Sequence, residues 1–477
     1  MALRTPEQYF ESLRDGRTVW FRGKPVDDVT RHPVIGKATR HGALDFAMAE
    51  DPAYRDLAVV EEGGQQYSRF YRIPRSTEDL LLRSRLIEAG TTAGNTLVVL
   101  LKEIGTDAIF ALLAVTAELD GPYHDRVQRF YEHCRDNDLA LSVAQTDAKG
   151  DRMLRPSEQE DPDMYLRVVE RRADGVVVRG AKFHTSCTTN ANEVIVLPTR
   201  AMGPEEQDWS IAFAVPVNTP GVRLIASPYG DRETRAMEHP ITHEHKMMET
   251  MTIFDDVFVP SDRIFLDGDT AAAGALALTF VEYHRFTAVS YKLPLVDAIC
   301  GAAALAADYN GIASAGHVRD KFARLIAYAE TLRAMTEKAA ERCVPKPGGQ
   351  VAPDPMTVNI AKSHFAHGYH EAVQHLQEIA GGLLVTAPGA EDWSTEELRP
   401  FLQKYLAGRK GVSGEQRTRL LNFVADLTAG EYGPYQELLA IHAEGSLEAE
   451  KLQILRSYQQ NGRAAQVIAT VAGMAGV

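Results

Sequence analysis

A cluster of polar side chains follows a short apolar run in the segment 137–152, NDLALSVAQTDAKGDR. The cluster consists of Thr146, Asp147, Lys149, Asp151 and Arg152. Hydroxyl, carboxylate and cationic groups at this density bind either a polar ligand or solvent. The segment therefore predicts either one wall of a pocket for a polar ligand or a charged turn at the surface.

A second group of hydrogen-bond donors follows the β-like run VVVRG, in the segment 180–186, GAKFHTS. Here Thr185 and Ser186 supply two adjacent hydroxyl groups. A flavin ring needs hydroxyl and backbone donors along one edge, and its pyrophosphate needs backbone N–H groups and nearby cations. The two segments together contain these groups and favour a pocket for a large, planar, polar cofactor.

Two glycines, Gly381 and Gly382, end a helical pattern in the segment IAGGL. Without side chains, they permit the backbone to approach a phosphate group closely. A glycine pair is also a common way to end a helix. The sequence has no GxGxxG motif after a strand, which disfavours a flavin bound in the Rossmann manner.

Composition narrows the class of protein. The chain has 477 residues, enough for two or three domains, and 51 basic against 65 acidic residues give a net charge of −14. This charge disfavours nucleic acid and an anionic membrane as partners. The four cysteines are far apart, which predicts neither disulfides nor a zinc site and favours a reducing cytosol. The N-terminus lacks a signal-peptide pattern, so we expect a cytoplasmic protein that does not span a membrane.

Periodicity predicts an α+β protein in three parts. Apolar residues at helical spacing indicate a helical domain over residues 1–145, with Ser76 and Thr77 as caps of one helix. Short β-rich runs separated by Gly, Pro and Asp indicate a β-rich domain over 146–268. Helical spacing returns over 269–477, interrupted at 344–355 by a Pro- and Gly-rich segment that predicts a flexible loop.

Over nearly its whole length, with these segments in this order, the chain resembles the superfamily of 4-hydroxyphenylacetate 3-monooxygenase and 4-hydroxybutyryl-CoA dehydratase. The resemblance implies an acyl-CoA dehydrogenase-like fold with a C-terminal four-helix bundle, assembled as a homotetramer. It also implies FAD contacts from residues 146–152 and from Thr185 or Ser186. Gly381 and Gly382 would approach the diphosphate or adenosine part, commonly from a neighbouring subunit.

The two branches of this superfamily differ at the residues that bind a metal cluster. The segments ADYNG, IAGGLLVT and KYLAGRKGV resemble the dehydratase branch, which holds an iron–sulfur cluster through three cysteines and a histidine. The histidine corresponds to His284, but Val99, Glu103 and Tyr291 stand at or near the cysteine positions, and Cys300 lies nine residues beyond Tyr291. We therefore predict no iron–sulfur cluster and no other metal site.

The resemblance also identifies three candidate catalytic residues. Glu249 corresponds to a proposed base, Lys292 to a lysine beside a lost cysteine, and His284 would meet a substrate oxygen. The alternatives are an ordinary salt bridge for Glu249, a core histidine for His284 and a solvated lysine for Lys292.

The phenol-binding groups of the hydroxylase branch are absent, since Glu103, Asp107 and Val143 stand at or near their positions. If Glu103 and Asp107 face the pocket, they favour an amine-bearing or cationic substrate. The alternative is that both carboxylates cap or solvate their helix.

These observations predict the oxygenase component of a two-component monooxygenase acting on a small organic substrate. It would receive FADH2 from a separate flavin reductase and use molecular oxygen as cosubstrate. The second hypothesis is a cluster-free relative of the CoA dehydratase acting on an acyl-CoA. A third, a helical scaffold that has lost its cofactor, is disfavoured because the polar residues of the cofactor segments remain.

Overall fold

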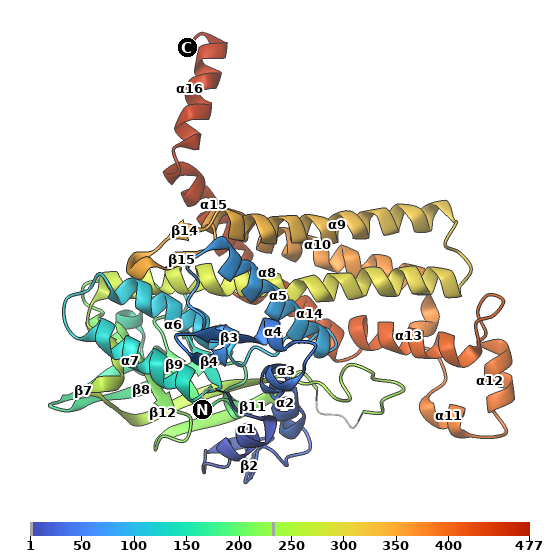
Figure 1. Ribbon diagram of the computed structural model, residues 1–477, viewed down its shortest axis with the longest axis horizontal. Helices are drawn as coiled ribbons and strands as arrows, with labels where there is room; N and C mark the ends of the chain where they lie inside the picture. Colours follow the sequence, from blue (N-terminus) through green and yellow to red (C-terminus); the bar gives the residue numbers. More distant parts are fainter. Residues whose placement is uncertain (1–2, 231–233) are drawn as a thin grey trace. The chain divides into compact units, whose positions relative to one another are not determined.

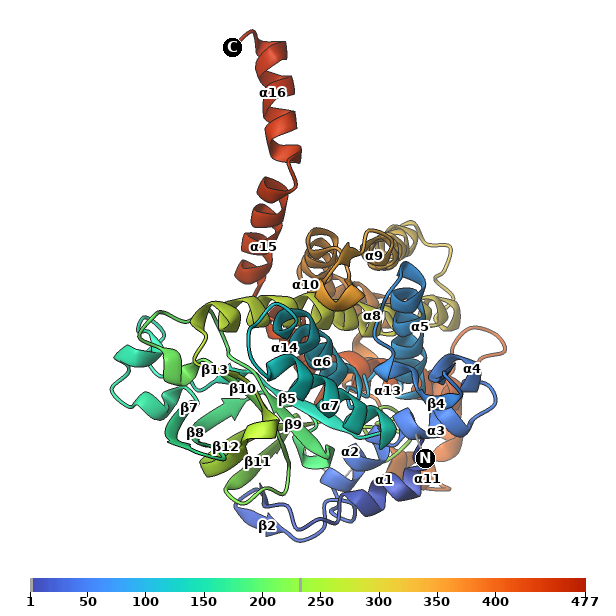
Figure 2. The same ribbon diagram turned by 60° about the vertical axis from the view of Figure 1, so that its left-hand side comes forward.

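The computed structural model describes residues 3–230 and 234–477. Within these ranges the chain forms two compact units, the first made of residues up to 230, 244–287 and 345–351, and the second made of the rest. Most helices and strands of both units are labelled in Figures 1 and 2. Helices and strands are mixed, as predicted. The three-domain division at 145 and 268 stays a prediction.

The first unit begins with short helices that surround a buried one. Thr5 and Gln8 cap the first helix reciprocally, and the side chain of Ser76 accepts a hydrogen bond from the Asp79 N–H, which confirms Ser76 as a cap. The helices are α1 (Pro6–Ser12), α2 (Ile35–Gly42), α3 (Leu44–Glu50), α4 (Arg55–Ala58), α5 (Thr77–Ala93), α6 (Glu103–Thr116) and α7 (Tyr123–Asp136). Helix α6 is buried along almost its whole length, so its few polar side chains must find partners inside the protein.

Two sheets form the β-rich part of the first unit. The larger has the order β2 (Lys24–Val26), β1 (Val19–Phe21), β11 (Val222–Pro228), β12 (Met248–Pro260), β8 (Gly175–Phe183) and β6 (Thr146–Asp147), with β7 (Arg167–Arg172) also paired to β8. The smaller has the order β13 (Ile264–Asp267), β10 (Ile211–Pro216), β9 (Glu193–Val196) and β5 (Leu141–Ala144). Phe213 of β10 and Phe254 of β12 meet edge to face at 5.8 Å, fully buried, so the sheets share a core.

Strand pairing brings the two predicted cofactor segments together. In the antiparallel pair of β6 and β8, Thr146 lies opposite Phe183 and Asp147 lies opposite Lys182. Strand β12 pairs with the other edge of β8, with Thr252 opposite Lys182. The hydroxyl pair after β8 and the start of β12 therefore lie at one end of the sheet, nearest to Thr146 at the start of β6. Because β6 runs antiparallel to β8, the polar loop leaves from the other end of β6. The strands β3 (Val59–Glu62) and β4 (Gln65–Ser68) form a separate hairpin.

A long helix, α8 (Thr270–Tyr309), begins in the first unit and ends in the second. It is the one helix in the described part of the chain that is long and apolar enough to cross a membrane. However, 56% of its most apolar window is buried inside the protein, as in the core helix of a globular domain. That the chain does not span a membrane stays a prediction.

The second unit is helical beyond α8. Its helices are α9 (Gly316–Glu341), α10 (Pro355–Ala380), α11 (Ala390–Ser394), α12 (Arg399–Tyr405), α13 (Gly414–Thr428), α14 (Tyr432–His442), α15 (Leu447–Gln460) and α16 (Arg463–Ala475). A buried ion pair, Lys362 to Glu450 at 2.7 Å, joins α10 to α15. Helix α16 extends beyond α15 (Figure 1) and exposes Ile468, Val471 and Met474.

The segment 344–355, predicted as a flexible loop, has local structure. It contains β14 (Val344–Pro345), a 3-10 turn at Pro347–Gly349, and β15 (Val351–Ala352). Gln350 is buried, and its side-chain amide donates to the Phe110 carbonyl at 2.7 Å. The glycines that suggested flexibility are needed instead for the turn, where Gly348 and Gly349 both have positive φ.

Candidate functional site

The candidate site is built around a buried ion pair between β6 and β8. Lys182 Nζ lies 2.8 Å from Asp147 Oδ1, and both side chains are 2% exposed. The ammonium also donates to the carbonyl oxygens of Gln145 and Leu197, and the carboxylate accepts from the Leu166 N–H. Burial lowers the pKa of Lys182, and the charge of Asp147 opposes that shift. Asp147, predicted to contact a cofactor, instead holds the polar loop against β8.

Beyond Asp147 the polar loop turns sharply. Lys149 has φ +73°, and its N–H donates to the Met164 carbonyl at 3.2 Å. The Asp151 carboxylate accepts from the Met153 N–H at 2.9 Å, and the Asp151 N–H donates to Gln159 Oε1 at the same distance. Asp151 therefore shapes the turn, while the half-buried Thr146 and the cations carry the predicted ligand contacts.

Three cations gather at this loop: Lys149, Arg152 and Arg200. Burial lowers the pKa of Lys149, and the charges of Arg152 and Arg200 lower it further, while Asp147 raises it. Arg200 comes next to Thr199, whose hydroxyl donates to Asp147. None of the three forms a side-chain salt bridge or hydrogen bond with any residue in 3–230 or 234–477. In an acidic protein, such a group favours an anionic ligand such as a diphosphate.

The two hydroxyls after β8 have different environments. Thr185 is fully buried, and its hydroxyl is 2.6 Å from Thr252 Oγ1 and 3.0 Å from the Thr250 carbonyl oxygen. Ser186 is partly exposed and donates to the Glu249 carboxylate, with oxygen–oxygen distances of 2.9 and 3.0 Å. Thr185 thus joins the ends of β8 and β12, and Ser186 is the hydroxyl placed to meet a ligand. Glu249 thus has a serine partner.

Helix α6 places Asp107 next to His284 inside the first unit. His284 Nδ1 lies 3.2 Å from Asp107 Oδ2, and the other carboxylate oxygen accepts from Arg83 at 2.7 Å and Thr287 at 3.0 Å. Because a carboxylate only accepts, the Nδ1 of His284 carries a proton and Nε2 is left to meet a ligand. Asp107 is 0% exposed and both its oxygens are bonded, so it orients His284 and is not placed to bind a cationic substrate.

Glu103, one turn earlier on α6, faces another carboxyl group. One Glu103 oxygen and one Asp45 oxygen accept from the same Lys102 N–H, at 3.1 and 3.2 Å. Burial raises the pKa of Glu103 and raises that of Asp45 well above its usual range, and repulsion from Glu103 adds to the shift of Asp45. Both shifts favour the neutral form of the carboxyl group. Glu103 therefore does not present the exposed carboxylate that the predicted cationic substrate needs.

The thiol of Cys187 connects these acids to Glu249. Its sulfur lies 3.7 Å from the Val99 carbonyl oxygen and is fully buried. Burial raises the pKa of Cys187 well above its usual range, and the charges of Glu249, Glu103 and Asp45 raise it further. Glu249, Glu103 of α6 and Asp45 of α3 therefore surround one thiol in the first unit.

Lys292 belongs to the second unit, where it is buried and paired. Its Nζ lies 2.6 Å from Glu444 Oε2, with the side chains 3% and 2% exposed, and the Tyr291 hydroxyl donates to the same carboxylate. Burial lowers the pKa of Lys292 to about 8, against the opposing effect of Glu444. This excludes the solvated helix lysine as the alternative, and a catalytic role for Lys292 stays a prediction.

The glycine pair lies at the end of α10 in the second unit. Gly381 has φ +87°, which requires glycine on steric grounds, and Gly382 begins a 3-10 turn. A Cβ added at either position would meet no atom within 4 Å. Packing within the described chain therefore does not require a glycine at 382. The predicted approach of a phosphate or a neighbouring subunit stays a prediction.

Family models match almost the entire chain. The N-terminal model of 4-hydroxyphenylacetate 3-hydroxylase matches residues 5–266, and its C-terminal model matches residues 273–472. The chain belongs to the 4-hydroxyphenylacetate 3-hydroxylase family. The superfamily expected from the cofactor segments is thereby confirmed, and with it an enzyme family.

Relatives of this family member come from both branches. It is 34% identical to 4-hydroxybutyryl-CoA dehydratase/vinylacetyl-CoA-Δ-isomerase of Clostridium aminobutyricum, over 97% of this chain and 98% of that one. It is 30% identical to the 4-hydroxyphenylacetate 3-monooxygenase oxygenase component of Thermus thermophilus, over 91% and 90%. Sequence identity therefore does not distinguish the monooxygenase hypothesis from the dehydratase hypothesis.

Solved structures define the fold. The oxygenase component (HpaB) of 4-hydroxyphenylacetate 3-monooxygenase, complexed with FAD, matches with a TM-score of 0.91 and 28% identity, over 99% of each chain. Glutaryl-coenzyme A dehydrogenase matches with a TM-score of 0.50 and 15% identity, over 89% of this chain and 87% of that one. The second match shows the acyl-CoA dehydrogenase fold alone. The predicted four-helix layout of the C-terminal part stays a prediction.

Several residues of this site have no counterpart in the sequence predictions. Lys182, Arg83 and Asp45 are charged residues whose partners lie far away along the chain. Arg200 comes shortly after the apolar run EVIVLP, as Lys149 comes shortly after LALSVA. This similar position after a strand-like run could have identified Arg200 as a candidate site residue. Strands that pair in parallel, as β5 and β9 do, bring such positions to the same edge.

The buried Lys292 predicts a pH dependence of stability. The unfolded chain binds the lysine proton up to its ordinary pKa of 10.5, whereas the folded protein releases it near pH 8. Between these values the unfolded state carries more protons, so the contribution of Lys292 to stability rises with pH. We expect the thermal midpoint of the native protein to rise relative to that of Lys292→Met as pH increases from 8 to 10.

The control is Lys451→Met, because Lys451 is an exposed lysine of the same unit, with a side chain 56% exposed. Its midpoint should follow that of the native protein at every pH. A constant difference between the native protein and Lys292→Met from pH 7 to 10 would show that Lys292 does not titrate in this range.

Proposed function

We propose that this protein is the oxygenase component of a two-component, FADH2-dependent monooxygenase. It would take FADH2 from a separate flavin reductase, use molecular oxygen, act on a small organic substrate, and work in the cytoplasm as a homotetramer. The observation that supports it is the group of three cations at the loop after β6, which have no side-chain partner among the described residues, together with the Ser186–Glu249 pair after β8. The match to an oxygenase component complexed with FAD adds to that support.

The residues present fit a bound FAD. Lys149, Arg152 and Arg200 would hold its diphosphate, and the Ser186 hydroxyl, whose proton goes to Glu249, would accept a hydrogen bond from an N–H of its ring. When bound as FADH2, the cofactor would be the group that reacts with molecular oxygen. The apolar, largely buried surroundings of α6 would keep water away from that reaction.

The protein's own groups would then handle the substrate. His284, held through Nδ1 by Asp107, would direct Nε2 to a substrate oxygen. Glu249 would accept a proton, with Ser186 holding its carboxylate in place. Asp107 acts through His284 and is a positioning residue.

Helix α16 supports the proposed homotetramer. Ile468, Val471 and Met474 are 67%, 56% and 82% exposed along it. Apolar side chains on a helix that extends beyond its own unit are expected to be covered in the assembled protein. We propose that a second copy of the chain covers them.

Loss of one cation should weaken cofactor binding. Arg200→Ala removes a charge that would bond the diphosphate, and hydrogen bonds to charged groups contribute about 1.5–3 kcal/mol. We expect the affinity for reduced FAD to fall about tenfold or more in an anaerobic fluorescence titration. Arg223→Ala is the matched control, because Arg223 is an exposed arginine of β11 that is paired with Asp255.

The hydroxyl pair gives a second measurement in the same titration. Ser186→Ala should reduce affinity by about 1 kcal/mol, the value of one buried hydrogen bond. Thr185→Ala should instead lower the thermal midpoint, because Thr185 joins β8 to β12. Native affinity in both Arg200→Ala and Ser186→Ala would remove the cation group and the hydroxyl pair from the cofactor site.

The second candidate is a cluster-free relative of the CoA dehydratase that acts on an acyl-CoA, and it is favoured by the 34% identity to that enzyme. The residues here do not fit an iron–sulfur cluster. Val99 and Glu103 supply no thiolate, and Tyr291 is bonded to Glu444. Cys187 supplies one buried thiol next to Val99, and clusters of this type need several.

Anaerobic purification and turnover separate these hypotheses. The purified protein should contain no stoichiometric iron or acid-labile sulfide, and substrate consumption with reduced FAD should require oxygen. Iron and sulfide in stoichiometric amounts would contradict the assignment of the cluster positions. Turnover of an acyl-CoA without oxygen would establish the second candidate in place of the monooxygenase.

A further inference from the structure

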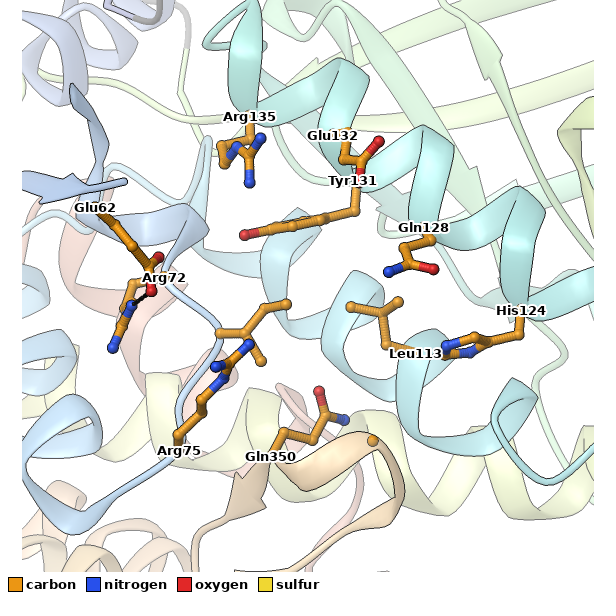
Figure 3. Close-up of a pocket in the computed structure, with 12 residues that line it drawn as sticks. Glu62, Arg72, Arg75, Leu113, His124, Gln128, Tyr131, Glu132, Arg135 and Gln350 are labelled. Atoms are coloured by element: carbon orange, nitrogen blue, oxygen red, sulfur yellow. Dashed lines mark ion pairs between the residues drawn. The ribbon is translucent and has the colours of Figure 1, made fainter. Parts of the chain in front are cut away.

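A cavity of about 310 Å³ lies in the first unit and contains none of the residues assigned above (Figure 3). Its walls come from the segment before α5, from α6, from α7 and from the turn at 347–350. This volume is at the lower end of the roughly 300–1,000 Å³ typical of small-molecule sites. The cavity is therefore large enough for a small ligand.

The inner wall of the cavity is rigid. Leu113, Tyr131 and Gln350 are buried, with 6%, 7% and 3% exposure. The Tyr131 hydroxyl donates to the Tyr71 carbonyl at 2.9 Å, and the Gln350 amide donates to the Phe110 carbonyl at 2.7 Å. Side chains fixed in this way need little reordering when a ligand binds, which lowers the entropic cost of binding.

Three arginines line the cavity, and two of them are held in place. Arg72 forms salt bridges with Glu62 at 2.5 Å and Asp79 at 3.3 Å. Arg135 bonds Asp136 through Nε at 2.8 Å, and its guanidinium lies 5.3 Å from the centre of the Tyr131 ring. Both guanidinium groups therefore keep fixed positions at the cavity.

Arg75 differs from the other two. Its side chain forms no salt bridge or hydrogen bond with the residues that the structure describes. Arg75 and Arg135 point toward the open centre from opposite sides (Figure 3). The charge of Arg75 is thus directed into the cavity with no carboxylate bonded to it.

The charge balance of the lining favours an anion. Glu62, one of two lining carboxylates, is already bonded to Arg72 and to the Tyr67 hydroxyl at 2.6 Å. The other, Glu132, is exposed at the cavity rim. The protein as a whole is acidic, with a net charge of −14, so three arginines at one cavity make this site locally basic.

We propose that this cavity binds a small organic anion. Its carboxylate or phosphate group pairs with Arg75, since guanidinium groups bond both anions in a bidentate manner. Its apolar body lies against Leu113 and Tyr131. This ligand is separate from the cofactor, and the proposal does not depend on the monooxygenase assignment.

Calorimetric titration of the full-length protein tests the proposal with three probes of one shape. Benzoate and phenyl phosphate carry the two anionic groups, and benzyl alcohol carries none. We expect at least one anion to bind and benzyl alcohol not to bind. Arg75→Ala should weaken the binding about tenfold or more, and because Arg75 is exposed, this variant should fold normally.

Two controls separate this cavity from other arginines. Arg85→Ala removes an exposed arginine of α5 that does not line the cavity, and Arg200→Ala removes one from the proposed cofactor loop. Both should bind the anion as the native protein does. Binding of benzoate alone or phenyl phosphate alone would support the proposal and identify the anionic group. Absence of binding by both, native affinity in Arg75→Ala, or an equal loss in Arg200→Ala would overturn it.

Discussion

The site depends on one buried ion pair, Lys182 with Asp147. Both side chains are 2% exposed, so neither charge is stable there without the other. Removing one partner of such a pair costs roughly 3–5 kcal/mol, because it leaves an uncompensated charge inside the protein. The pair fixes the loop of Lys149 and Arg152 to β8, and the Thr199 hydroxyl on the same carboxylate fixes Arg200. The three cations repel one another, but they can lie close together because Asp147 holds the backbone segments that carry them.

Buried acidic residues on α6 also fix the positions of other groups in the site. Asp107 distributes its two oxygens among Arg83, Thr287 and His284, which compensates its charge and orients the imidazole. Glu103 meets Asp45, and burial raises the pKa of both carboxyl groups. Two carboxyl groups one turn apart on the same helix therefore have different partners, since Asp107 meets a guanidinium, a hydroxyl and an imidazole, whereas Glu103 meets another carboxyl group. Environment and not residue type sets this difference.

Local sequence patterns predicted the structural features that depend on residues close together in the chain. The Ser76 cap, the alternation of helical and β-rich segments, and the placement of Thr185 and Ser186 after a strand all follow from short-range spacing. Sequence did not predict the partners of charged residues, because Asp147 and Lys182 meet only through strand pairing. For the same reason Glu103 and Asp107 were predicted to face a substrate, whereas the structure turns both toward buried partners. The segment 344–355 shows the opposite error, since its glycines serve a turn with fixed geometry.

The most direct measurement is the affinity of Asp147→Asn for reduced FAD, in an anaerobic titration at a temperature where circular dichroism shows the variant folded. Asp147 is buried, and removing its negative charge would by itself favour an anionic ligand, so a loss of affinity can arise only through the loop that it holds. We expect the affinity to fall by at least as much as in Arg200→Ala, because the variant releases the loop that carries Lys149 and Arg152. Native affinity in folded Asp147→Asn would contradict the account, since the ion pair would then not position the cofactor site.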